Sequence, residues 1–127
     1  MSSSGPLSKI MSFVTAGEAV QHWSHQRLTA IALIPLVLWL VISLLSQFAA
    51  PYESVVSWIS SPVVTVLFIV LFVVMFYHAK LGLQVVIEDY IHTDKTKVAV
   101  LLFTKFATIA GAIAGVGAVL TISLGAP

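Results

Sequence analysis

Residues 77–92 read "YHAKLGLQVVIEDYIH" and place ionisable side chains directly after the apolar run "VVTVLFIVLFVVMF". The first of them is His78. If residues 63–90 form one helix, His78 lies ~18 Å inside the end near Tyr90, because a helix rises about 1.5 Å per residue. Ionisable groups at such a depth in a membrane helix are rare, costly and usually functional. Three roles are open to His78: axial ligand to a haem iron, proton relay, or hydrogen-bond partner of a neighbouring helix.

Helical spacing puts His78 in a stripe with Gly82, Val85 and Asp89, at steps of 4, 3 and 4 residues. A glycine one turn from a histidine leaves room for a flat macrocycle beside the helix. Because haem iron accepts neutral imidazole as an axial ligand, this stripe could hold a porphyrin. Spacing alone still leaves a packing or relay role open for His78.

A second axial ligand at the depth of His78 is not evident in the sequence. We expect the other histidines to lie near the cytoplasmic boundary of the membrane, far from that depth: His22, His25 and His92. A haem with two histidine ligands would therefore take its other ligand from another chain. The roles of His22 and His25 are left undecided.

Asp89 and Tyr90 lie where the predicted helix leaves the membrane. Tyr90 either anchors the helix at the interface or donates a hydrogen bond to a carbonyl while its ring stays in the apolar layer. Asp89 is either a solvated loop residue or part of a site that takes up protons. A carboxylate at a helix C-terminus opposes the helix dipole, so Arg27, Lys105, a partner subunit or water should compensate Asp89.

Two cationic side chains, Arg27 and Lys80, are expected in the same half of the membrane. Arg27, at the start of the first apolar run, either marks topology or pairs with a carboxylate such as a haem propionate or Asp89. Lys80 points roughly opposite His78, and its side chain should lean toward the amino end of the helix. We expect Lys80 to meet Gln84, a partner chain or a lipid headgroup.

The elements that must position these residues are membrane helices. The chain has 127 residues, of which 59% are hydrophobic and only 9% charged, and its mean hydropathy is +1.06. Soluble domains carry about 25% charged residues, so this composition indicates a membrane protein. Without cysteine the chain provides no disulfide, thiolate metal site or iron–sulfur ligand. The scattered basic residues form no nucleic-acid-binding patch.

The charged residues are absent from three long stretches, which predicts an all-α integral membrane protein with spans at about 28–48, 63–88 and 98–124. The runs lack the polar alternation of barrel strands. Ser61 and Pro62 mark the start of the second span, and Pro35 should bend the first. Gly111 and Gly115, in "GAIAG", predict close helix packing, although small residues are common in membrane helices generally.

Lysines and arginines set the orientation. They flank the first span on its amino-terminal side and surround the second connection, whereas the first connection and the C-terminus have none. The N-terminus is therefore expected on the cytoplasmic or matrix side and the C-terminus outside. Residues 1–127 are expected to form a single membrane-anchor domain, in which residues 1–27 are an N-terminal surface segment. They resemble neither a signal peptide nor a transit peptide.

The segment "HAKLGLQVVIEDY", with Gly82 four residues after His78 and Asp89-Tyr90 eleven and twelve after it, resembles the hydrophobic membrane anchor (D) subunit of succinate dehydrogenase, complex II. "SHQRLTAIALIPL", with Arg27 entering the first span, is similar to the same family, as are the chain length and the three spans. The resemblance extends from about Gln21 to the end of the chain.

This resemblance implies a function in electron transport. The family's anchor pairs with a second anchor subunit (cytochrome b, C), and the two bind one haem b; the matching axial ligand to the haem iron here is His78. The pair docks the iron–sulfur and flavoprotein subunits. The resemblance also implies that Tyr90 hydrogen-bonds ubiquinone beside Asp89, and that Arg27 lies near the haem propionates and the quinone. Because quinone reduction takes up two protons, our hypothesis is that Asp89 and the neighbouring histidines supply them. The chain is then a non-flavin subunit of an enzyme and is not catalytic by itself.

Two alternatives remain beside succinate oxidation. One is an anchor of a quinol:fumarate reductase, which runs the same reaction in reverse. The other is a cofactor-free helical membrane protein, such as a transporter subunit or assembly factor, although its ionisable residues would then be expected through both leaflets. The expected location is a bacterial cytoplasmic membrane, with the mitochondrial inner membrane as the alternative.

Overall fold

The computed structural model describes residues 5–125, and over this part of the chain it contains helices and no strand. Three helices are long and apolar enough to cross a membrane, and a fourth, α2, is a short helix in the first connection. The predicted all-α fold with three membrane helices is confirmed. The four helices are α1 (Pro6–Gln47), α2 (Tyr52–Ser60), α3 (Pro62–Tyr90) and α4 (Asp94–Gly125).

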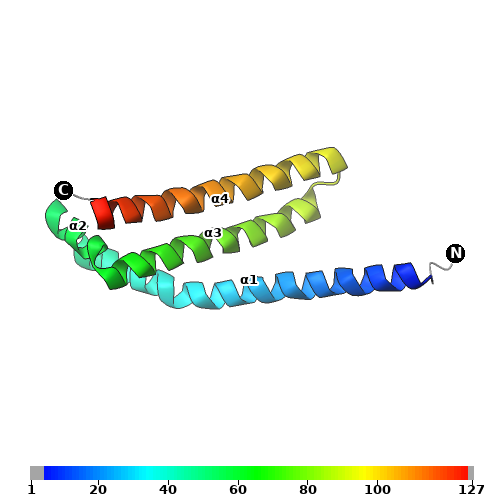
Figure 1. Ribbon diagram of the computed structural model, residues 1–127, viewed down its shortest axis with the longest axis horizontal. Helices are drawn as coiled ribbons and strands as arrows, with labels where there is room; N and C mark the ends of the chain where they lie inside the picture. The colour runs from blue at the N-terminus through cyan, green and yellow to red at the C-terminus, as the bar shows by residue number, and fades with distance from the viewer. Residues whose placement is uncertain (1–4, 126–127) are drawn as a thin grey trace.

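The three long helices lie side by side in one layer, with α3 between α1 and α4 (Figure 1). The start of α1 and the connection at residues 91–93 lie toward the same end of the layer. The first connection, with α2, and the end of α4 lie at the opposite end. This pairing of ends agrees with the connectivity expected of three spans. The end with residues 91–93 is called the predicted cytoplasmic end below.

The helix boundaries agree with the sequence at one point and differ at two others. α3 begins at Pro62 after Ser61, as predicted, but the Ser61 side chain makes no capping bond; its carbonyl oxygen accepts the Thr65 N–H at 2.9 Å. The first difference is α2, a helix that was not predicted from the sequence and that occupies most of the first connection. The second difference is that residues 6–27 and the first predicted span form one continuous helix, with Pro35 inside it.

At the end of the layer opposite the predicted cytoplasmic end, aromatic rings join α1, α2 and α3. The rings of Trp39 and Phe68 meet edge to face at 5.3 Å, and Trp58 lies 5.6 Å from Phe68. The Thr65 hydroxyl donates to Ser123 Oγ of α4 at 3.1 Å. These contacts tie the short helix α2 and all three spans together at this end.

Two glycines of α4 let it approach α3 closely. A Cβ built on Gly111 would lie 2.5 Å from the ring of Phe76, and one on Gly115 would lie 2.7 Å from the ring of Phe72. Such distances exclude any side chain unless the ring moves. The small-residue face predicted from "GAIAG" is therefore confirmed as a packing surface, and its partner is a pair of phenylalanines one turn apart.

We expect Gly115→Ala to lower the free energy of unfolding by about 1–3 kcal/mol, because the added methyl overpacks the base of the Phe72 ring. Gly117→Ala is the matched control, since a Cβ at Gly117 meets no atom within 4 Å. The measurement is denaturation of the purified protein in detergent. Equal stability of the two variants would contradict the close packing of α3 on α4.

Candidate functional site

His78 of α3 contacts Thr29 of α1. The Thr29 Oγ1 atom lies 2.8 Å from Nδ1 of His78, and both side chains are partly buried between the helices. The same hydroxyl reaches two backbone carbonyl oxygens of its own helix, that of His25 at 2.8 Å and that of Gln26 at 3.0 Å. Thr29 thus connects the backbone of α1 to the imidazole of α3.

The hydrogen-bond capacity of Thr29 limits the tautomer of His78. A threonine hydroxyl has one proton and two lone pairs, whereas a carbonyl oxygen only accepts. When the hydroxyl donates to the carbonyl of His25, it can only accept from His78, so Nδ1 carries the ring proton. In a neutral ring, this tautomer places the lone pair on the other nitrogen, Nε2. A neutral imidazole held through one nitrogen in this way is the usual form of a metal-ligating histidine.

His78 also lines an open apolar groove along α1, with a volume of about 430 Å³. The groove extends from the level of Thr29 away from the predicted cytoplasmic end. Its walls carry no charged side chain, so a flat apolar group could lie against them. Apart from His78, the lining residues are Ala30, Leu33, Ile34, Val37, Leu38 and Val41.

Gly82, one turn after His78, faces α1 as well. A Cβ at Gly82 would lie 3.4 Å from Nε2 of Gln26, which is an ordinary contact for a side chain. Gly82 therefore lies against Gln26, but this contact does not require a glycine. A role for Gly82 in haem clearance stays a prediction.

His25 lies beside Tyr77, with its Nδ1 2.7 Å from the tyrosine oxygen. Tyr77 precedes His78 in the chain, so the prediction that His25 lies far from the depth of His78 is wrong. The reason is that α1 remains helical through residues 22–29 and packs along α3. The His25 ring bonds Tyr77, and His25 is not among the residues lining the groove with His78.

Arg27, Asp89 and Tyr90 are exposed and are not brought together. The Arg27 guanidinium lies over the ring of Trp23, 5.2 Å from its centroid. Taking Thr29 and His78 to be at one level, Arg27 and Asp89 are ~13 Å apart along the helix axes. Tyr90 is 78% exposed at the end of α3. Pairing of Arg27 with Asp89 within this chain is therefore not part of the structure.

Lys80 leans toward the amino end of α3, as expected. Its ammonium lies 5.9 Å from the centroid of the Tyr77 ring, one turn earlier. Gln84, which the sequence suggested as its partner, donates from Nε2 to Glu88 at 3.1 Å. Lys80 and Gln84 still line one pocket between α3 and α4.

A second polar pocket, of about 510 Å³, lies near the predicted cytoplasmic end. It is lined by Glu18, Ala19 and His22 of α1 and by Gln84 and Glu88 of α3. Close to it, two buried polar atoms have no hydrogen-bond partner in the described part of the chain, Nε2 of His22 and Oε1 of Gln26.

Sequence reasoning missed the contribution of Thr29 and this polar pocket. For Thr29 the available signal was a hydroxyl residue four positions after His25, inside an otherwise apolar run. For the pocket it was the spacing of Glu18, His22 and Gln26, which fall on one face of a helix at steps of four.

The residues fit one half of a haem site. Over residues 5–125 no group of three His, Asp or Glu side chains could hold a metal ion by itself. A haem iron needs fewer protein ligands, because the porphyrin supplies its in-plane nitrogens. A histidine whose ring is held through Nδ1, with an open apolar groove beside it, has the features of one axial ligand of a haem iron.

Comparison with known proteins places the chain in a family. Residues 1–112 match the family model described as "Succinate dehydrogenase/Fumarate reductase transmembrane subunit". The succinate dehydrogenase hydrophobic membrane anchor subunit of Rickettsia bellii is 31% identical over 105 residues, which cover 83% of this chain and 84% of that protein. That of Rickettsia conorii is 30% identical over 75% of this chain and 76% of the relative.

A more distant relative is the succinate dehydrogenase membrane anchor subunit of Reclinomonas americana, 24% identical over 80% of this chain and 87% of that protein. No solved structure matches the chain. The family match covers α1, α2, α3 and the first half of α4, and so includes every residue of the candidate site. The chain belongs to the succinate dehydrogenase/fumarate reductase transmembrane subunit family, and the three relatives above are named membrane anchor subunits of succinate dehydrogenase.

Proposed function

We propose that this chain anchors a succinate:ubiquinone oxidoreductase in the membrane, supplies one axial ligand to haem b and forms part of the ubiquinone-reduction site. The observation that carries the proposal is the hydrogen bond between Thr29 and His78 at 2.8 Å. It occupies Nδ1 and leaves Nε2 as the nitrogen that binds iron. The family match and the named anchor subunits support the anchoring part of this function.

In this proposal the haem, when bound, supplies a one-electron carrier within the membrane. His78 holds its iron on one side, and Thr29 fixes the orientation of the imidazole. The second axial ligand comes from a second anchor subunit, because His25 is engaged with Tyr77 and His22 lies farther along α1. Arg27, exposed on α1, is available to a haem propionate or to the quinone pocket formed with other subunits.

Tyr90 and Asp89 form this chain's part of the quinone site. Both are exposed at the last turn of α3, where partner subunits can cover them. The Tyr90 hydroxyl donates a hydrogen bond to a quinone carbonyl, and Asp89 supplies protons from the aqueous side. The polar pocket of Glu18, His22 and Glu88, in the same part of the layer, supports a hydrated path toward this region.

The enzyme is completed by other subunits. Iron–sulfur and flavoprotein subunits dock at the predicted cytoplasmic end and carry out succinate oxidation, for which a cysteine-free chain provides no iron–sulfur ligands. The family description covers both succinate dehydrogenase and fumarate reductase, and the relatives named succinate dehydrogenase favour succinate oxidation. The Rickettsia relatives favour a bacterial cytoplasmic membrane, and the Reclinomonas relative leaves the mitochondrial inner membrane as the alternative.

The proposal is tested first with His78→Ala in the purified complex. The reduced-minus-oxidised absorption spectrum of the wild type should show a low-spin b-type haem, and the variant should lose it or convert it to high spin, because one axial nitrogen is gone. Identical spectra, or a wild-type complex without haem, would rule out His78 as a ligand.

Thr29→Val is expected to weaken haem retention by about 10–100-fold, the usual effect of removing an outer hydrogen-bond partner of a ligating histidine. Thr29→Ser keeps the hydroxyl and should retain the wild-type haem content and spectrum. Thr108→Val is the matched control, since Thr108 is a buried threonine whose hydroxyl bonds only carbonyls of its own helix, at 2.8 and 3.0 Å. Haem loss in the control as well would show that the effect is general destabilisation.

At the quinone site, Tyr90→Phe should lower kcat/KM for ubiquinone by about tenfold, the effect of losing one hydrogen bond to the bound quinone. Haem content should be unchanged, because Tyr90 lies three turns from His78 along α3.

Asp89→Asn should lower the rate of ubiquinone reduction most at high pH, where protons are scarce. A wild-type pH profile in Asp89→Asn would remove that residue from the proton path.

A further inference from the structure

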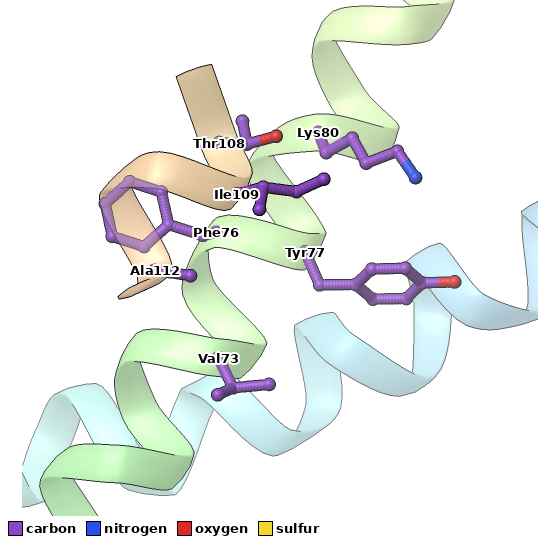
Figure 2. A pocket seen from close by; sticks show the side chains of 7 residues that line it. All are labelled: Val73, Phe76, Tyr77, Lys80, Thr108, Ile109 and Ala112. Carbon is purple, nitrogen blue, oxygen red and sulfur yellow. The ribbon is translucent and has the colours of Figure 1, made fainter. Parts of the chain in front are cut away.

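A long groove between α3 and α4 lies on the side of α3 away from His78. Three pockets with shared lining residues make it continuous. The first, about 250 Å³, is lined by Lys80, Gln84, Thr104 and Lys105 together with two leucines. The second, about 170 Å³, shares Lys80 with the first and is drawn in Figure 2. The third, about 350 Å³, shares Val73 and Ala112 with the second and extends to Leu120.

The end of this α3–α4 groove nearest the predicted cytoplasmic end is cationic. Lys80 lies ~15 Å from the end of α3 and Lys105 ~16 Å from the start of α4, so the two antiparallel helices place them at the same depth. Among the described residues no carboxylate lines any of the three pockets. Glu88, the nearest acid along α3, accepts a bond from Gln84 instead. Two ammonium groups at this depth without a carboxylate in the groove favour an anion from outside the chain.

The rest of the groove is apolar. Beyond Lys80 its walls are mainly aliphatic or aromatic, and the third pocket has no polar side chain in its lining. Figure 2 shows Lys80 and Tyr77 projecting from the same side of α3, above Val73. The Lys80 ammonium lies over the Tyr77 ring, at the junction between the cationic pocket and the apolar ones. The groove therefore has one charged end and one long apolar arm.

We propose that the α3–α4 groove binds one anionic phospholipid. The headgroup phosphate lies between Lys80 and Lys105, near the Thr104 hydroxyl, and one acyl chain follows the apolar arm toward Leu120. The pattern of charge matches a lipid of the cytoplasmic leaflet, where anionic headgroups meet basic pockets between membrane helices.

The direction of Lys80 favours a lipid over the second anchor subunit. Lys80 follows His78 by two residues and therefore points about 200° around the helix from it. The second anchor subunit, which would complete the haem site, approaches the His78 side. This step rests on the proposed haem site, whereas the charge and shape of the α3–α4 groove do not, and the test below measures lipid retention rather than haem.

The test measures lipid retained by the whole purified complex. Complex reconstituted in nanodiscs of equal phosphatidylglycerol and phosphatidylcholine is extracted in mild detergent and analysed by native mass spectrometry. The wild type should retain one phosphatidylglycerol in preference to phosphatidylcholine. Replacing each lysine should lower this retention about fivefold, so Lys80→Gln/Lys105→Gln should nearly abolish it.

Lys95→Gln/Lys97→Gln is the matched control, since it removes the same charge in the first turn of α4, outside the groove. It should retain phosphatidylglycerol as the wild type does. Circular dichroism and size-exclusion elution check that the double variants are folded and assembled, independently of haem. Equal retention of the two lipids by the wild type, or full retention by Lys80→Gln/Lys105→Gln, would overturn the proposal.

A second variant tests the apolar arm. Gly117 lines the third pocket and a Cβ there meets nothing within 4 Å, so Gly117→Leu should fill the groove and lower lipid retention with both lysines present. Excess inorganic phosphate should not displace the bound lipid. Displacement by phosphate, or a covalent cross-link of Lys80 to a partner-subunit carboxylate in place of lipid, would assign the lysines to another ligand and refute a lipid site.

Discussion

Polar side chains inside a bilayer need partners within the protein, and this requirement fixes how α1 lies on α3. Apolar burial alone gives little preference for one level of α1 on α3, because lipid solvates apolar surfaces as well as protein does. Two hydrogen bonds set the register, between Thr29 and His78 and between His25 and Tyr77. A shift of one turn would break both and leave two histidines without partners. The apolar groove beside His78 and the approach of Gln26 to Gly82 both follow from this register.

The other face of α3 is held differently. There, α4 is positioned by shape, with the rings of Phe72 and Phe76 filling the space above Gly115 and Gly111. No polar bond is needed at this contact, and no carboxylate among the described residues that line the α3–α4 groove pairs with Lys80 or Lys105. α3 is thus held to α1 by two hydrogen bonds near His78, and to α4 by rings packed on two glycines together with the Thr65–Ser123 hydrogen bond at the far end. Its central position lets one helix present His78 and Lys80 in opposite directions at nearly the same depth.

The lengths and order of the spans could be predicted from sequence because charged residues are excluded from the hydrocarbon, and Pro62 after Ser61 marked the start of α3. The close packing at Gly111 and Gly115 was also predictable from their spacing, although the identity of the partner helix was not. The register of α1 was not, since hydrophobic periodicity defines the faces of a helix but not its level against a neighbour. The depth of His25 was mistaken for this reason, because Arg27 was taken to mark the membrane boundary. α2 was missed because its nine residues are shorter than a span and follow Pro51.

The three roles considered for His78 from the sequence are not mutually exclusive, since an imidazole has two nitrogens. Nδ1 bonds the neighbouring helix through Thr29, which leaves Nε2 for another partner. The bond that sets the register of α1 therefore also sets the direction of the free nitrogen. A histidine used only for packing would need no groove beside it, and an isolated ligand would lack the support that holds its ring. Because one hydrogen bond does both, the position of Nε2 of His78, the nitrogen proposed to bind haem iron, is determined by how two apolar helices pack.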